Sequence, residues 1–136
     1  VLFRSYRRMR ALVAESFAPF AARLPALAGT PRLLGTSGTV TTLASVHLGL
    51  ERYDRSQVDG LIAPAAAMRA ISQELAGMSL AERAQLPCIG RERADLVVAG
   101  CAILEGILDI WPAERLGVAD RGIREGILSR LMETGA

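Results

Sequence analysis

The segment from Arg32 to Ser45, RLLGTSGTVTTLAS, constrains the fold of this chain more than any other stretch. Its two leucines precede a cluster of small residues, Gly35-Thr36-Ser37-Gly38-Thr39, and apolar residues at helical spacing follow that cluster. A strand, a tight turn and a helix in this order are typical of α/β proteins, which commonly hold a phosphate at such a turn. The segment therefore predicts α/β layering around a candidate phosphate-binding loop.

The composition predicts a single folded domain without a membrane span. Of the 136 residues, 51% are hydrophobic and 22% are charged, which is enough apolar surface for a core. The formal net charge of +2 gives no argument for a nucleic-acid partner. Acidic residues interrupt the longest apolar stretch, 94–111, and the first ten residues lack the apolar centre of a signal peptide. Two distant cysteines and one histidine do not form a zinc set, and they indicate a reducing, cytoplasmic setting.

The apolar spacing predicts a helix-rich α/β order. The expected elements are a helix over 6–24 that Pro19 kinks or divides, a strand over 31–35, a helix over 39–48, a strand over 58–63, a helix over 64–76, a short helix after the capping box Ser79–Glu82, a helix over 92–111, a strand over 115–119 and a closing helix from about 122. We divide the chain into an N-terminal helix and connector, 1–30, and an α/β lobe, 31–136. Cys101 is predicted to be a buried free thiol because it lies in an apolar helix.

Side chains outside the loops are predicted to be structural. The arginines Arg7, Arg8 and Arg10 favour a solvated helix face, although they could contact an anionic partner. His47 is expected at the surface, without a catalytic partner. Tyr53 and Trp111 are interpreted as packing residues at the ends of elements. The acidic residues of the long helix follow helical spacing and predict a narrow polar stripe on an otherwise buried helix: Glu92, Asp95, Glu105 and Asp109.

The loop from Gly35 to Thr39 offers donors for an anion. Backbone N–H groups at the start of the following helix carry partial positive charge, and the hydroxyls of Thr36, Ser37 and Thr39 add further donors. The loop is not a Walker A motif, because that motif needs a lysine and the chain has none. The alternative is a plain strand-to-helix turn with Ser37 or Thr39 as the N-cap. The loop alone leaves both interpretations open.

Two further loops carry arginines near helix starts. VADRGIREG, 118–126, leaves a strand and enters a helix, so Arg121 and Arg124 are placed to clamp phosphate oxygens or to lie on the helix surface. GRERAD, 90–95, puts Arg91 and Arg93 ahead of the long helix, where a helix start with ion pairing is the favoured interpretation.

Taken in order, four stretches resemble the Ppx/GppA phosphatase family of exopolyphosphatases and guanosine pentaphosphate phosphohydrolases. They are GTSGTVTTLA, LGLERYDRSQVDG, MSLAERAQLPCIGRERADLVVAGCAIL and VADRGIREGIL. The resemblance implies one lobe of the two-lobe fold shared by actin, sugar kinases and Hsp70 ATPase domains (ribonuclease H-like). The chain resembles the second lobe, because the D-x-G-S and D-x-G-G-G-S loops of the family's first lobe are absent from it. We therefore expect it to be a piece of a longer protein.

The sequence departs from the family pattern at two positions. Family members commonly have V-H-G where this chain has Val58-Asp59-Gly60, and they often have glycine where it has Cys88. Asp59 puts a polar role of that position in doubt, because histidine donates a hydrogen bond and a carboxylate does not. Cys88 is interpreted as a detail of the loop.

The resemblance implies hydrolysis of a phosphoanhydride bond, with release of the terminal phosphate of inorganic polyphosphate or guanosine pentaphosphate (pppGpp). It places the catalytic residues and most ligands of the expected Mg²⁺ in the absent lobe, so that we predict neither a catalytic residue nor a metal site in this chain and no turnover by it alone. The expected partners are that lobe and a second copy of the chain. The residues expected to bind the substrate phosphate are Gly35, Thr36, Ser37, Gly38, Thr39 and Arg124.

Two alternatives from other classes remain at this point. One is the nucleotide-binding lobe of a sugar kinase or ATPase with the same fold. The other is a non-enzymatic helical module, whose long helix would form a subunit interface through its alanines and glycines.

Overall fold

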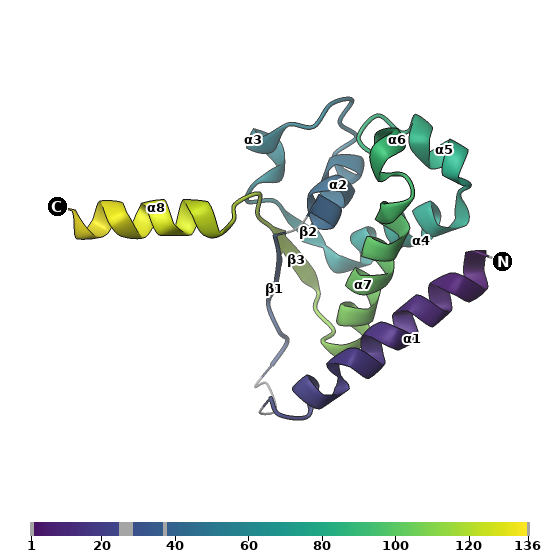
Figure 1. Ribbon diagram of the computed structural model, residues 1–136, viewed down its shortest axis with the longest axis horizontal. Helices are drawn as coiled ribbons and strands as arrows, with labels where there is room; N and C mark the ends of the chain where they lie inside the picture. Colours follow the sequence, from purple (N-terminus) through teal and green to yellow (C-terminus); the bar gives the residue numbers. More distant parts are fainter. Residues whose placement is uncertain (1, 25–28, 37, 136) are drawn as a thin grey trace.

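The computed structural model describes residues 2–24, 29–36 and 38–135 (Figure 1). The helices are α1 (Leu2–Ala21), α2 (Gly38–His47), α3 (Arg55–Val58), α4 (Ala65–Gly77), α5 (Leu80–Gln85), α6 (Gly90–Arg93), α7 (Leu96–Ile110) and α8 (Ile123–Thr134). The strands are β1 (Leu33–Gly35), β2 (Ile62–Pro64) and β3 (Arg115–Val118). The expected helix-rich α/β order is confirmed, with two additional short helices, α3 and α6.

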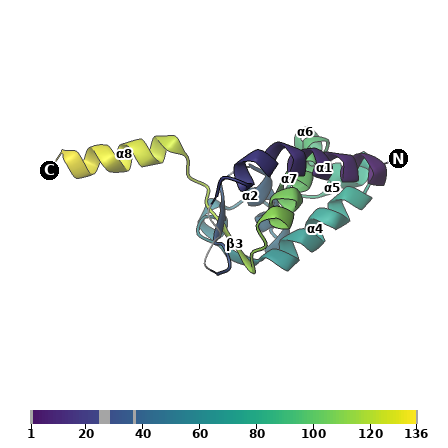
Figure 2. The ribbon, with the colours of Figure 1, turned by 90° about the horizontal axis from the view of Figure 1, so that it is seen from below.

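The strands form a small mixed sheet with the order β1-β3-β2. The central strand β3 runs parallel to β1 and antiparallel to β2, and Leu33, Leu116 and Ala63 lie side by side on one face. Helices α2 and α4 cover that face, α7 packs on both helices, and α1 packs on α7 and α4 (Figures 1 and 2). The helical layers on this side of the sheet contain the apolar core.

The opposite face of the sheet is open in the described part of the chain. Leu34 and Ile62 flank Gly117 in the register, and their side chains are 68% and 59% exposed. A hollow of about 760 Å³ lies beside them and is also lined by Arg32 and Arg115. This apolar face is therefore available to a further layer.

Helix α1 is fixed to α7 by buried polar contacts as well as by apolar packing. Tyr6 donates a hydrogen bond to Glu105 Oε1 at 2.8 Å, and Arg10 lies 3.0 Å from Glu105 Oε2. Arg10 and Arg69 of α4 also pair with Asp109. The predicted acidic stripe of the long helix is thus half buried in ion pairs, and the expectation that Arg10 is solvated is wrong because α1 packs on this stripe.

The aromatic residues at the other end of α1 pack as expected. Trp111 makes edge-to-face contacts with Phe17 and Phe20, at centroid distances of 5.8 and 6.0 Å. Pro19 lies inside the single helix α1, two residues before its end, and does not divide it. Near this end, few backbone hydrogen bonds remain for a proline to interrupt.

The predicted helix over 92–111 is interrupted, and α6 and α7 are separate elements. The buried Arg83 donates from Nε to the carbonyl of Ala94 at 2.7 Å and from a terminal nitrogen to the carbonyl of Leu75 at 3.2 Å. A side chain that takes a carbonyl in this way competes with the backbone hydrogen bonds of a continuous helix. Helix α7 also packs on α1, α2 and α4, as expected for a largely buried helix, which leaves little of it for the subunit interface of the alternative helical module.

The second strand begins later than predicted. The side chain of Asp54 accepts a hydrogen bond from the Ser56 N–H at 2.9 Å and caps α3, which takes Val58 out of the expected strand. Pro64, expected as the first residue of a helix, is the last residue of β2 and precedes α4. The capping box of Ser79 and Glu82 is confirmed at the start of α5.

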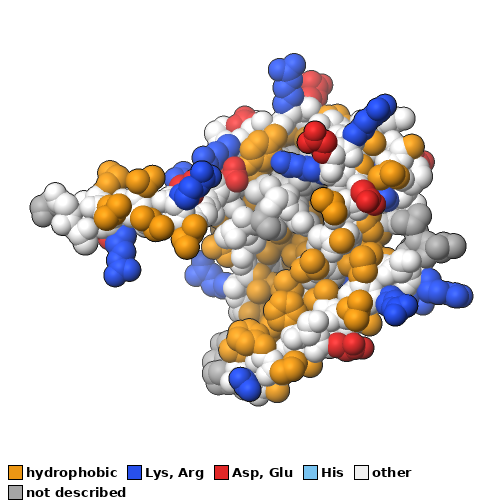
Figure 3. All heavy atoms as spheres, viewed as in Figure 1, with side chains coloured by type: hydrophobic (Ala, Val, Ile, Leu, Met, Phe, Trp, Pro, Cys, Tyr) orange, Lys and Arg blue, Asp and Glu red, His pale blue; other side chains and the backbone are white. Residues whose placement is uncertain are grey.

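Helix α8 projects away from the rest of the molecule (Figures 1 and 2). None of its described residues is buried, and hydrophobic side chains cover much of its visible surface (Figure 3). The exposed apolar side chains are those of Ile123, Ile127, Leu128, Leu131 and Met132. A search of the described helices finds none that combines the length and apolarity of a membrane span.

Candidate functional site

The candidate site lies where the parallel strands β1 and β3 end. Gly35 pairs with Val118 in the register, and the Ala119 N–H donates to the Gly35 carbonyl at 2.9 Å. The loops that follow the two strands therefore meet at one edge of the sheet, which is the usual ligand side of an α/β sheet. A hollow of about 380 Å³, here called the strand-end cavity, is lined by Thr36, Arg55, Asp120, Arg121, Gly122, Ile123, Arg124 and Glu125.

The structure brings two of the predicted binding residues together in this cavity. Thr36 follows β1 and Arg124 lies in the first turn of α8, and both line the hollow although 88 positions separate them. Thr36 is exposed, so its hydroxyl is accessible from the cavity. Ser37 lies outside the described residues.

Gly35 and Thr39 are held by packing. A Cβ atom at Gly35 would lie 2.6 Å from Val40 Cγ1, so this glycine allows β1 to approach α2. A Cβ atom at Gly100 would lie 2.1 Å from the hydroxyl oxygen of Thr39, which shows that the Thr39 side chain rests on α7. The Thr39 hydroxyl, expected as a ligand donor, is thus directed at the core, and the backbone N–H of Thr39 remains as its candidate donor.

The first turn of α2 has backbone donors without an acceptor among the described residues. The N–H groups of Gly38, Thr39 and Val40 donate to no acceptor among the residues that the structure describes. Gly38 is exposed, and a Cβ atom there would meet nothing within 4 Å. Its carbonyl accepts a hydrogen bond from the Thr41 hydroxyl at 3.1 Å, which holds the turn. These amides are the partly positive end of a helix and favour an anion.

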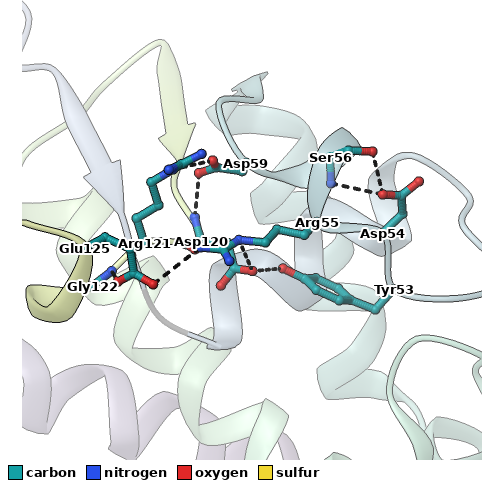
Figure 4. A network of polar contacts seen from close by, with 9 residues as sticks. All are labelled: Tyr53, Asp54, Arg55, Ser56, Asp59, Asp120, Arg121, Gly122 and Glu125. Carbon is teal, nitrogen blue, oxygen red and sulfur yellow. Dashed lines mark hydrogen bonds and ion pairs between the residues drawn. The ribbon is translucent and has the colours of Figure 1, made fainter. Parts of the chain in front are cut away.

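Arg121 is engaged by Asp59 (Figure 4). Its Nε lies 2.7 Å from Asp59 Oδ2, and Asp59 Oδ1 accepts the backbone N–H of Asp120 at 2.9 Å. The backbone hydrogen bond and the Arg121 guanidinium hold the pKa of Asp59 below its usual value. Asp59, which stands where family members commonly have histidine, therefore has a polar role in this structure. Its carboxylate accepts the hydrogen bonds that fix the turn after β3.

Asp120 is shared between Tyr53 and Arg55 (Figure 4). The Tyr53 hydroxyl donates to Asp120 Oδ2, and Arg55 donates to the Asp120 carbonyl while its Nε lies 3.4 Å from Oδ2. Partial burial and the contact with Asp120 raise the pKa of Tyr53 to about 12. Tyr53 is 46% exposed, so it is a polar tie and not the packing residue that its position predicted.

Arg124 stands at the start of α8 beside a capped helix terminus. Glu125 Oε2 accepts the Gly122 N–H at 2.8 Å, and this hydrogen bond is the main cause that lowers the pKa of Glu125, to which the charge of Arg124 adds a smaller part. Arg124 is exposed and forms neither a hydrogen bond nor an ion pair with any described residue. Its guanidinium is thus available to a ligand in the strand-end cavity.

Two residues in and just before α3, Tyr53 and Arg55, contribute to this site without having been predicted from the sequence. The segment 51–57 has the polar, turn-rich composition of a connector, and its only local signal is Asp54 ahead of Ser56, which matches an N-cap. Arg55 reaches the cavity, and Tyr53 reaches Asp120 of the cavity wall, because β2 returns next to β3, a contact that no local pattern encodes. Arg91 and Arg93 of α6 are exposed and lie outside the cavity lining, and His47 is exposed as expected.

The cavity combines arginines with carboxylates that the protein itself engages. Its carboxylates are committed to the protein itself, Asp120 to Tyr53 and Arg55, and Glu125 to Gly122. Within the described ranges, no group of three histidine, cysteine, aspartate or glutamate side chains is placed to hold a metal ion. The lining offers the Thr36 hydroxyl and arginine side chains, which are donor types suited to an anion.

Solved structures with the same fold are known. The chain superposes on a Ppx/GppA family member from Aquifex aeolicus with a TM-score of 0.80 at 23% identity, covering 96% of this chain and 41% of that one. It superposes on an exopolyphosphatase from Cytophaga hutchinsonii with a TM-score of 0.80 at 20% identity, covering 96% and 42%. The structure is thus part of an actin-like fold.

The family follows from the sequence comparison. The model of the Ppx/GppA phosphatase family matches residues 3–134, and the chain belongs to this family. Exopolyphosphatase 2 of Mycobacterium tuberculosis is 29% identical over 123 residues, which are 87% of this chain and 38% of that protein. The chain thus spans about two fifths of the length of these relatives.

Proposed function

We propose that the chain is the substrate-binding part of a phosphoanhydride hydrolase that releases the terminal phosphate of inorganic polyphosphate or pppGpp. The observation that carries the proposal is the strand-end cavity, which is lined by Thr36 and by Arg124, whose side chain forms no hydrogen bond or ion pair with a described residue. Amides and guanidinium groups are the donors that stabilise charge on phosphoryl oxygens. The family membership makes phosphoanhydride hydrolysis the favoured chemistry over that of a kinase or a helical module.

The catalytic base and the metal ligands are assigned to a further lobe. The chain spans 38% of the exopolyphosphatase relative, and α8 and the outer face of the sheet expose apolar side chains against which such a lobe would pack. The described acidic side chains around the cavity do not fit a Mg²⁺ site, because Asp59, Asp120 and Glu125 are engaged by the protein itself. We therefore derive no metal-dependent step from this chain. The two free cysteines suit a reducing, cytoplasmic setting.

The chain alone is expected to bind substrate without turning it over. Positioning donors without a base to orient the attacking water give binding but not hydrolysis. The exposed apolar surfaces would also let two copies associate in the absence of the lobe. Phosphate release from polyphosphate or pppGpp well above background, with Mg²⁺ present, would contradict the proposed division of labour.

The binding part of the proposal is tested by calorimetric titration with tripolyphosphate. Arg124→Gln removes the free guanidinium, and we expect it to weaken binding about tenfold, since a charge-assisted hydrogen bond contributes about 1.5–3 kcal/mol. The matched control is Arg130→Gln, an exposed arginine of α8 that does not line the cavity. Equal affinities of the wild type and Arg124→Gln would contradict the proposed site.

A further inference from the structure

Arg55 reaches the strand-end cavity from α3. It lies in the family-like stretch LGLERYDRSQVDG, but it is not among the residues expected from the sequence to bind phosphate. It lines the same hollow as Thr36 and Arg124, and half of its side chain is exposed. Arg121 lines this hollow as well, so three arginines surround one small volume. The question is which of them keeps charge and donors available to a ligand.

Arg55 is presented by a rigid turn. Asp54 caps α3 by accepting hydrogen bonds from the Ser56 N–H at 2.9 Å, the Ser56 hydroxyl at 2.6 Å and Gln57 Nε2 at 2.8 Å. At its other end, the Arg55 side chain donates to the backbone carbonyl of Asp120. The guanidinium is thus fixed across the turn that leads from β3 into α8 (Figure 4).

The ion pairs of Arg55 are long and leave donors unused. Its Nε lies 3.4 Å from Asp120 Oδ2, an oxygen that already accepts the Tyr53 hydroxyl, and its terminal nitrogen lies 3.6 Å from Glu125 Oε1. A guanidinium has five N–H donors, and those on the second terminal nitrogen of Arg55 bond to no described atom. Arg55 therefore keeps donors that a phosphate oxygen can take.

Arg121 differs from Arg55 in the length of its ion pair and in the charge that it keeps available to a ligand. Its Nε lies 2.7 Å from Asp59, and the same carboxylate receives the backbone N–H of Asp120. A short pair with a carboxylate that is itself fixed by the backbone compensates the charge of Arg121 locally. Arg121 is therefore a structural tie of the turn, in spite of its place in the cavity wall.

We infer that Arg55 is a second guanidinium ligand of the terminal phosphate, acting from α3 opposite Arg124 on α8, and that Arg121 is not a ligand. The inference rests on the proposed function, since it assigns a residue to that same phosphate site. Two arginines on different elements contact different oxygens of one phosphoryl group, which fixes its orientation as well as its charge. The site then selects a terminal phosphate, whose three outer oxygens can serve both arginines.

The test is titration of the full chain with tripolyphosphate, with variants of each arginine. We expect Arg55→Gln to weaken binding about tenfold, Arg55→Lys to weaken it less because it keeps the charge, and Arg121→Gln to change it by less than about threefold. Arg130→Gln is the matched control that should bind as the wild type does. Far-UV circular dichroism of each variant reports whether its helices are retained.

The outcomes separate this inference from the proposed function. A wild-type chain that does not bind tripolyphosphate removes the proposed site altogether. A wild type that binds, with Arg124→Gln weakened and Arg55→Gln unchanged, overturns the assignment of Arg55 alone, and so does an Arg121→Gln loss as large as that of Arg55→Gln. If Arg55→Gln unfolds, the side-chain Nε–H resonance of Arg55 in the wild type decides: a shift on titration supports the inference, and a constant position overturns it.

Discussion

The chain contains two networks of the same chemical kind in very different surroundings. The inner network joins α1, α4 and α7 through Tyr6, Arg10, Arg69, Glu105 and Asp109. The outer network joins α3 to the turn after β3 through Tyr53, Arg55, Asp59, Asp120 and Arg121. In each, a tyrosine hydroxyl donates to a carboxylate that also contacts arginine. Their difference is access to water: the Glu105 side chain is 0% exposed and that of Asp120 is 36% exposed.

The difference in solvent exposure gives the two networks different effects on stability. Removing one partner from a buried charge cluster leaves the others without compensation, so the inner network contributes to holding the helices together. Exposed pairs are screened by water and contribute little to stability, so the outer network is expected to add little to the free energy of unfolding. The same pairs of residue types thus hold helices together on one side of the molecule and, in the proposed function, border a phosphate site on the other.

The largest expected effect comes from neutralising the inner carboxylate. Glu105→Gln keeps the size of the side chain but leaves Arg10 and Arg69 without their shared buried charge. We expect the free energy of unfolding to fall by about 3 kcal/mol, the low end for a broken buried pair because both arginines are 30% exposed. Urea denaturation measures it.

The matched change in the outer network is Asp120→Asn. We expect it to lower the free energy of unfolding by less than about 1 kcal/mol, as is typical of exposed pairs. Equal losses in the two variants would show that burial does not separate the networks.

A further difference in stability is expected between two glycines of the loop after β1, Gly35 and Gly38. Gly35→Ala places a methyl group 2.6 Å from Val40 Cγ1, and overpacking of this kind costs about 1–3 kcal/mol. Gly38→Ala meets nothing within 4 Å and should change stability by less than about 0.5 kcal/mol. Thermal unfolding of both variants compares the packed and the open end of one loop, and a loss at Gly38 as large as that at Gly35 would contradict this division.

The smallest expected effect is spectroscopic and separates the two tyrosines. Burial and the contact with Glu105 raise the pKa of Tyr6, while burial and Asp120 raise the pKa of Tyr53 to about 12. In both cases the neutral hydroxyl stabilises the folded state below pH of about 10, and that contribution is lost as the pH rises through the folded pKa. Absorbance at 295 nm should show no tyrosinate near pH 10, with Tyr53 ionising before Tyr6.

The tyrosine assignment has a direct control in Tyr53→Phe. The chain has two tyrosines, so this variant should lose the earlier step of the titration and keep the later one. An ordinary transition near pH 10 in the wild type would show that neither hydroxyl is held by its carboxylate.

Local patterns predict most elements of this fold but not the contacts between them. Periodicity and caps locate α1, α2, α4, α5 and α8, and the capping box at Ser79 is found where expected. The break between α6 and α7 was missed because its cause is Arg83, a buried side chain from another element that takes the Ala94 carbonyl. Glu105 looks like part of a solvated stripe in the sequence, and only the packing of α1 buries it.

The candidate site, like the fold, can be predicted from the sequence only in the parts that carry a local pattern. The loop after β1 and Arg124 are recognisable because each lies at a strand-to-helix junction, and the parallel pairing of β1 with β3 unites them. Arg55 and Asp59 belong to a segment without a local signal for binding, and they reach the turn after β3 through the antiparallel strand β2. The position of a side chain that strand order brings to the site therefore cannot be predicted from local sequence patterns.

The account depends on one claim, that the strand-end cavity receives a phosphate. A crystal structure of the chain with tripolyphosphate tests it most directly. We expect phosphate oxygens within hydrogen-bonding distance of the Gly38 and Thr39 amides and of the Arg124 guanidinium. An anion seated instead on the exposed arginines of α1, with the cavity unchanged, would contradict the account.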